Sequence, residues 1–140
     1  MAGRIFLMLL LALVWQSPAM AAKPVAPELV EGTMRVSAEQ AVELATGMAG
    51  LVIIDNRYHE EYVKGHIEGA LNLVGPDIER AELARVAPDR DTPLLFYCNG
   101  ESCLRSAGAA QKAAQWGYRR IYWFRGGWLE WMAKKLPVSK

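Results

Sequence analysis

The two cysteines of the chain, Cys98 and Cys103, stand five positions apart in the segment 96–108, which reads FYCNGESCLRSAG. Cys98 directly follows an apolar run, and a segment typical of a helix begins near Arg105. A thiol is nucleophilic as its thiolate, and a helix amino terminus with a nearby cation lowers the pKa of a thiol below its ordinary value of about 8.5. This placement predicts that Cys98 is a nucleophile at neutral pH.

Both cysteines also have plainer interpretations. Cys98 could be a small buried apolar residue, and Cys103 could be a resolving thiol, the disulfide partner of Cys98, or a loop residue that faces the core. An oxidising compartment would favour pairing of cysteines so close in sequence. We expect no metal and no cofactor, because two thiols without a histidine in the same loop supply half of the ligands that zinc usually needs.

Six residues separate Cys98 from Arg105, and their backbone amides could form a ring that holds a sulfur anion or an oxyanion. Gly100 would permit the turn of this loop. Arg105 would lie in the first helical turn, where its positive charge opposes the helix dipole and so calls for an anionic partner. The candidate binding residues between them are Asn99, Gly100, Glu101, Ser102, Cys103 and Leu104.

Short apolar runs alternate with helix-like segments, which predicts an α/β domain with a central parallel sheet of about five strands and helices on both faces. Reactive groups in such a sheet collect beyond the carboxyl ends of the strands, where Cys98 would lie. The expected strands are 34–36, 51–55, 70–74, 93–97 and 121–124. The expected helices are 38–46, 60–64, 77–84, 105–116 and 128–135, the first with a capping box of Ser37 and Gln40.

Residues 1–21 read as a secretory signal, with one positive charge, an apolar core too short to span a bilayer, and small residues before a cut after Ala21. Residues 22–32 are expected to form a tether or an arm lying on the domain, and residues 33–140 the domain itself. Without the predicted signal, residues 22–140 number 119 and carry 15 basic and 15 acidic side chains. This balance indicates no nucleic acid and no membrane partner, and we expect an exported monomer, periplasmic in a Gram-negative source.

Three segments resemble the motifs of rhodanese-like domains, in the same order. The first is IDNRYHEEYVKGHIEGALNL, the second combines FYC with RSAGAA, and the third is RGGWLEWMAKKLPV. The resemblance runs over residues 36–138 and implies a single rhodanese-like domain. It also implies a sulfurtransferase that moves a sulfane sulfur from a small donor, such as thiosulfate or polysulfide, to a thiol acceptor of small-molecule or protein origin.

Under this resemblance Cys98 carries the sulfur as a persulfide, the loop amides hold the outer sulfur, and Arg105 attracts the anionic donor. Asp55 and Arg57 lie at the end of a predicted strand, and we expect them to form an ion pair with Glu61 that shapes the site. The loop departs from the family pattern in length. It has six residues before the arginine, whereas the resembled sulfurtransferases have four and the related phosphatases and arsenate reductases have five.

Two alternative functions remain open at this level. The protein could be a thiol-disulfide or oxyanion-reducing enzyme that cycles Cys98 and Cys103 between dithiol and disulfide. It could also be a non-catalytic binding module that keeps the fold and uses the pocket, or the face around Trp128, to hold a partner protein.

Overall fold

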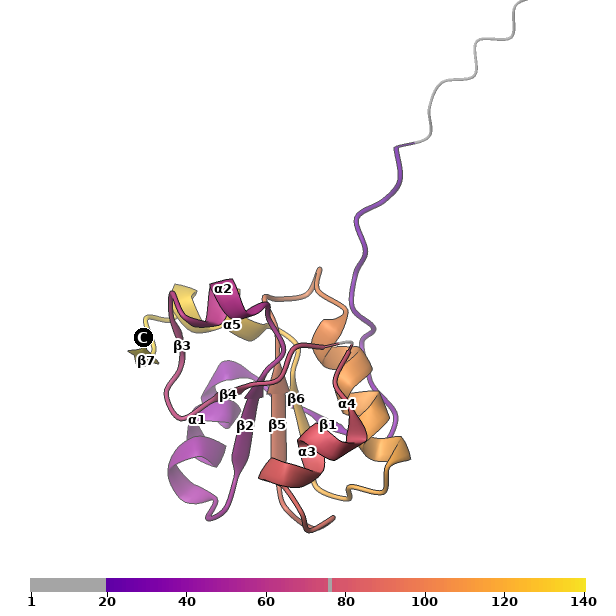
Figure 1. Cartoon of the computed structure of the whole chain (residues 1–140). Coiled ribbons are helices and arrows are strands. Elements are labelled where there is room, and N and C mark those ends of the chain that lie inside the picture. Colours follow the sequence, from indigo (N-terminus) through magenta and orange to yellow (C-terminus); the bar gives the residue numbers. More distant parts are fainter. Residues whose placement is uncertain (1–19, 76) are drawn as a thin grey trace, which may run out of the picture.

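A five-stranded parallel sheet forms the centre of the molecule in the computed structural model, which describes residues 20–75 and 77–140 (Figure 1). The strand order is β1-β6-β5-β2-β4, so the strand that leads into the cysteine loop is the middle one. The strands are β1 (Met34–Arg35), β2 (Val52–Asp55), β4 (Leu71–Asn72), β5 (Leu94–Tyr97) and β6 (Ile121–Phe124).

Helices cover both faces of this sheet, as the sequence predicts (Figure 1). One face packs against the third and fourth helices, and the other packs against the first and the fifth, because alternate strand residues point to opposite sides. The helices are α1 (Ala38–Gly47), α2 (His59–Tyr62), α3 (Arg80–Val86), α4 (Arg105–Gln115) and α5 (Gly127–Ala133).

The middle strands show this alternation directly. Phe96 and Trp123 lie in the core under α4, where alanines allow the helix to approach the sheet closely. Leu95 and Tyr97 lie in the opposite core, with Trp131 of α5. The expected capping box of α1 is confirmed, since Ser37 Oγ accepts from Gln40 N and Gln40 Oε1 accepts from Ser37 N.

A second, two-stranded antiparallel sheet was not predicted. It pairs β3 (His66–Ile67) with β7 (Val138–Ser139), which lie far apart in the sequence. Strands of two residues have no periodicity, and only the tertiary contact creates them. The helix predicted at 77–84 was placed too early in the sequence, because α3 begins at Arg80.

The predicted arm lies on the domain, since Ala26 and Val30 are buried in the same core as α4. Residues 1–19, most of the predicted signal segment, lie outside the described residues. None of the helices in the described ranges is long and apolar enough to cross a membrane.

Candidate active site

The middle strands end at the same level, which gathers the residues after them at one edge of the sheet. Asp55 of β2 pairs with Tyr97 of β5, and Tyr97 pairs with Phe124 of β6. Cys98 therefore emerges beside the ends of both neighbouring strands, and Arg125 emerges next to it after β6. The prediction that Cys98 lies beyond the carboxyl ends of the strands is confirmed.

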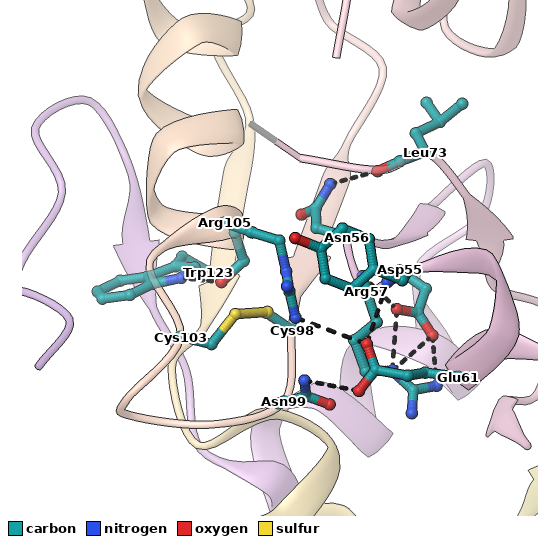
Figure 2. The surroundings of a disulfide bond; sticks show 12 residues. Asp55, Asn56, Arg57, Glu61, Leu73, Cys98, Asn99, Cys103, Arg105 and Trp123 are labelled. Carbon is teal, nitrogen blue, oxygen red and sulfur yellow. Dashed lines mark hydrogen bonds and ion pairs between the residues drawn. A yellow bond between two sulfur atoms is a disulfide. The ribbon is translucent and has the colours of Figure 1, made fainter. Parts of the chain in front are cut away.

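Cys98 and Cys103 form a disulfide across the loop, with their Cα atoms 6.4 Å apart (Figure 2). Of the alternatives left open for Cys103, the structure shows the disulfide with Cys98, which is also the bond that a resolving thiol would form. Cys98 is only 1% exposed, whereas Cys103 is partly exposed and has exposed neighbours, Ser102 and Leu104. The two sulfurs of one bond therefore belong to residues that differ in their access to solvent.

The start of the loop is held by the amino end of α5. Trp128 N donates to Cys98 O at 2.8 Å, and Leu129 N donates to Asn99 O at 2.9 Å. Gly127 allows this contact because its φ is +55° and a Cβ at this position would lie 2.3 Å from Cys98 O. The backbone of the predicted nucleophile is thus fixed by a glycine turn distant in sequence.

Gly100 begins a turn of the loop, as expected, because its carbonyl accepts from Cys103 N at 3.0 Å. Its φ lies outside the left-handed region, so this turn does not depend on the backbone freedom of glycine. Gly100 is also buried, and a Cβ there would lie 3.3 Å from Leu129 Cδ1. Within the described part of the chain, Cys103 has the only amide of segment 99–104 that donates to a backbone carbonyl, that of Gly100 at 3.0 Å. The ring of anion-binding amides stays a prediction.

Glu61 contacts the loop rather than the Asp55–Arg57 pair, which corrects the expectation that all three would join. Glu61 Oε2 lies 3.6 Å from Arg105 Nη2, and Asn99 Nδ2 donates to Glu61 Oε1 at 2.9 Å. The Arg105 guanidinium also lies over the Tyr58 ring, 4.2 Å from its centroid. Arg105 Nε is buried without an acceptor among the described residues, so this cation keeps a free donor.

Asp55 and Arg57 form the expected ion pair, and it is fully buried. Arg57 Nη2 donates to Asp55 Oδ2 at 2.7 Å and to Gly65 O at 2.7 Å, while Tyr97 OH donates to Asp55 Oδ2 at 2.5 Å. Burial alone would lower the pKa of Arg57, but the hydrogen bonds and charge of Asp55 outweigh it and raise that pKa. Burial and the same carboxylate raise the pKa of Tyr97, so its phenol stays protonated.

Arg125 joins the arm to the loop, and the sequence analysis missed it. Its side chain is 4% exposed and forms an ion pair with Glu101, Nη1 to Oε1 at 2.6 Å. Arg125 Nη2 donates to Ala26 O and Nε donates to Pro27 O, both at 2.9 Å, and Glu28 Oε1 lies 3.2 Å from Nη2. A cation directly after a predicted strand, in the segment RGG, was the signal that could have revealed this contact.

A cavity of about 250 Å³ opens beside the loop. Arg57 forms one wall with the Trp128 ring, whose centroid lies 4.3 Å from the guanidinium carbon. The exposed Lys64 places a positive charge at this cavity, and Glu61 places a carboxylate there. The full lining is Arg57, Glu61, Lys64, Gly65, Asn99 and Trp128. In the described ranges no group of three or more His, Cys, Asp or Glu side chains could hold a metal ion.

A five-stranded parallel α/β sheet with a cysteine at the end of its middle strand, followed by a short loop and an arginine at the start of a helix, defines a rhodanese-type domain. The chain belongs to the rhodanese-like domain family, whose model matches residues 37–134. The resemblance and the fold predicted from the sequence are therefore confirmed.

Known relatives differ in function. The chain is 38% identical over 91 residues to an HTH-type transcriptional regulator of Mycobacterium tuberculosis, covering 64% of this chain but only 38% of the regulator. It is 37% identical over 97 residues to the thiosulfate sulfurtransferase GlpE of Pseudomonas entomophila, covering 69% of this chain and 83% of that enzyme. Among solved structures, the BH2092 protein of Bacillus halodurans superposes with a TM-score of 0.66, at 26% identity over 76% of each chain.

Proposed function

We propose that this protein is a sulfurtransferase that carries a sulfane sulfur as a persulfide on Cys98. One observation carries the proposal: the Cys103 sulfur is bonded to the Cys98 sulfur. The outer sulfur of a persulfide would occupy the same kind of position, one bond from Cys98 Sγ. The loop thus accommodates a second sulfur at this site, and the similarity to a thiosulfate sulfurtransferase gives the reaction class.

The reaction begins from the reduced loop. The Cys98 thiolate attacks the outer sulfur of thiosulfate, the sulfur–sulfur bond of the donor breaks, and sulfite leaves with the electron pair. The product is a persulfide anion on Cys98, which then passes its outer sulfur to a thiophilic acceptor. Arg105 at the amino end of α4 supplies positive charge to the donor and to the persulfide.

The supporting residues position the site rather than react. Asp55 neutralises Arg57, so Arg57 forms a wall of the cavity without attracting an anion strongly. Glu61 accepts a hydrogen bond from the Asn99 side chain, and its carboxylate partly neutralises the charge of Arg105. Lys64 at the rim is the remaining cation for an incoming donor such as thiosulfate or polysulfide.

The test is mass spectrometry of the reduced protein after one equivalent of thiosulfate, with sulfite measured in parallel. Cys103→Ser is the informative variant because its Cys98 has no internal partner, and it should gain one sulfur atom on Cys98 as sulfite appears. Cys98→Ser should gain none. Absence of sulfur on Cys98 in the Cys103→Ser protein, under conditions where sulfite release is also absent, would refute the proposal.

The disulfide favours a second candidate, a thiol-disulfide oxidoreductase that uses no sulfur donor. In that case Cys103→Ser would abolish activity and would take up no sulfur. A binding module, by contrast, would keep its biological activity after Cys98→Ser. We further propose export of the protein, to the periplasm in a Gram-negative host, since an oxidising compartment suits a stable disulfide.

A further inference from the structure

We propose that Cys103 is the internal acceptor of the sulfurtransferase reaction, so that the protein reduces sulfane sulfur to sulfide and ends each turnover as the Cys98–Cys103 disulfide. This inference rests on the proposed function, because it requires a persulfide on Cys98. It adds a second reacting residue, a product and a class of partner, which is a dithiol that resets the loop.

The geometry points to Cys103 because it already makes the bond that the step would form. The loop brings the two sulfurs together between the end of β5 and the start of α4, and the amide of Cys103 bonds Gly100 O within the same loop. No other thiol competes, since the chain has two cysteines. The step therefore needs no rearrangement of the sheet or the helices.

The atoms and electrons of the step balance. The Cys103 thiol loses its proton and attacks Cys98 Sγ, the bond between Cys98 Sγ and the outer sulfur breaks, and the outer sulfur leaves with the electron pair. It leaves with the Cys103 proton as hydrosulfide. The sulfane sulfur is reduced to sulfide, and the two cysteine thiols are oxidised to one disulfide. An external dithiol then supplies two electrons and two protons to restore both cysteines.

The exposure of the two residues indicates where this dithiol attacks. Cys98 is 1% exposed, whereas Cys103 is partly exposed between solvent-exposed neighbours. A reductant thiolate therefore reaches Cys103 and displaces Cys98, which leaves as the thiolate of the residue nearest the strand end. The second thiol of the reductant then releases Cys103. The order returns Cys98 directly to its nucleophilic form.

The experiment is a single turnover without any external acceptor. The protein is reduced, freed of reductant under anaerobic conditions and given one equivalent of thiosulfate, and sulfite, sulfide and protein mass are followed. The wild type should release sulfite and then sulfide in equal amounts, and its mass should fall by two hydrogens relative to the reduced protein. Cys103→Ser should release sulfite but lose sulfide release entirely, and it should keep one added sulfur.

Gln111→Ala is the control, because it changes an exposed residue of α4 outside the cysteine loop and keeps both cysteines. It should release sulfide as the wild type does. If the wild type keeps the added sulfur and releases no sulfide, the internal step is refuted while the persulfide proposal stands. If Cys103→Ser takes up no sulfur and releases no sulfite, the proposed function itself fails. Reducing the oxidised wild type with dithiothreitol, removing the reductant and adding a second equivalent of thiosulfate should give one further round of sulfide release.

Discussion

Arg125 forms an ion pair with Glu101, 2.6 Å from Nη1 to Oε1, and so connects the end of β6 to the middle of the cysteine loop. The same guanidinium binds the backbone of the arm at Ala26 and Pro27. The loop is consequently held from outside by a buried cation that takes no part in the proposed chemistry.

Replacing Arg125 with alanine should lower the free energy of unfolding by about 1–3 kcal/mol, because the change leaves the carbonyls of Ala26 and Pro27 without their donor. Urea denaturation measures this loss. Glu28→Gln is the control, because Glu28 is 76% exposed and touches the same guanidinium. It should cost less than about 1 kcal/mol. Equal losses for the two variants would contradict the buried role of Arg125.

Replacing Tyr97 with phenylalanine should lower the free energy of unfolding by about 1–3 kcal/mol, because Asp55 loses a donor and Ile67 N loses an acceptor. The pKa of Tyr97 is raised in the folded state above its ordinary value of 10.0. The contribution of the phenol to stability is thus complete below pH 10.0 and is lost as the pH rises through the folded pKa. Denaturation curves should show a smaller alkaline loss in the variant than in the wild type.

Replacing Gly127 with alanine should destabilise the protein and displace Cys98, because the added Cβ would lie 2.3 Å from Cys98 O in a backbone conformation that favours glycine. We expect a loss of about 2–3 kcal/mol and slower sulfur uptake. Gly108→Ala is the control, since a Cβ there meets nothing within 4 Å and helix propensity favours alanine. A Gly127→Ala protein as stable and as active as the wild type would contradict the contact.

Replacing Arg105 with alanine should slow sulfite release from thiosulfate about a hundredfold, because the proposed site loses the charge that stabilises the donor and the persulfide. Glu61→Gln should have the opposite effect, because it removes a negative charge beside Arg105. It keeps an acceptor for Asn99 and removes the carboxylate that lies 3.6 Å from Arg105, so uptake of an anionic donor should become faster. Initial rates at several thiosulfate concentrations separate binding from reaction. Unchanged rates in Arg105→Ala would exclude the proposed role.

Reducing the disulfide should lower the free energy of unfolding by about 2 kcal/mol, since the bond closes a short loop and restrains the unfolded chain only modestly. The reduced protein should stay folded, because its two cores consist of strand and helix side chains. Circular dichroism and thermal denaturation in the presence and absence of dithiothreitol provide the measurement. Loss of the native spectrum on reduction would mean that the dithiol form cannot serve in turnover.

The sequence predicted those parts of the fold that depend on local pattern. Apolar runs located β2, β5 and β6 to within a residue, and Ser37 with Gln40 located the start of α1. The position of Cys98 at the carboxyl edge followed from the parallel sheet. The pairing of β3 with β7 did not, because two residues carry no periodic signal.

The partners of the charged residues were harder to predict. Asp55 and Arg57 pair locally, two positions apart, and were identified correctly. Glu61 was assigned to the same pair, but the course of α2 turns it toward Arg105. The disulfide was one of several possibilities, because a spacing of five permits the bond without requiring it. Such choices depend on side-chain direction, which the sequence pattern does not specify.

The whole segment proposed to react, from Cys98 to Arg105, occupies one uninterrupted stretch between a strand and a helix. Chemistry confined in this way is modular. Replacing one loop on a related scaffold would transfer both sulfurs and the cation together. Under the proposed reaction, the second cysteine of the loop would convert an enzyme that hands sulfur onward into one that liberates it.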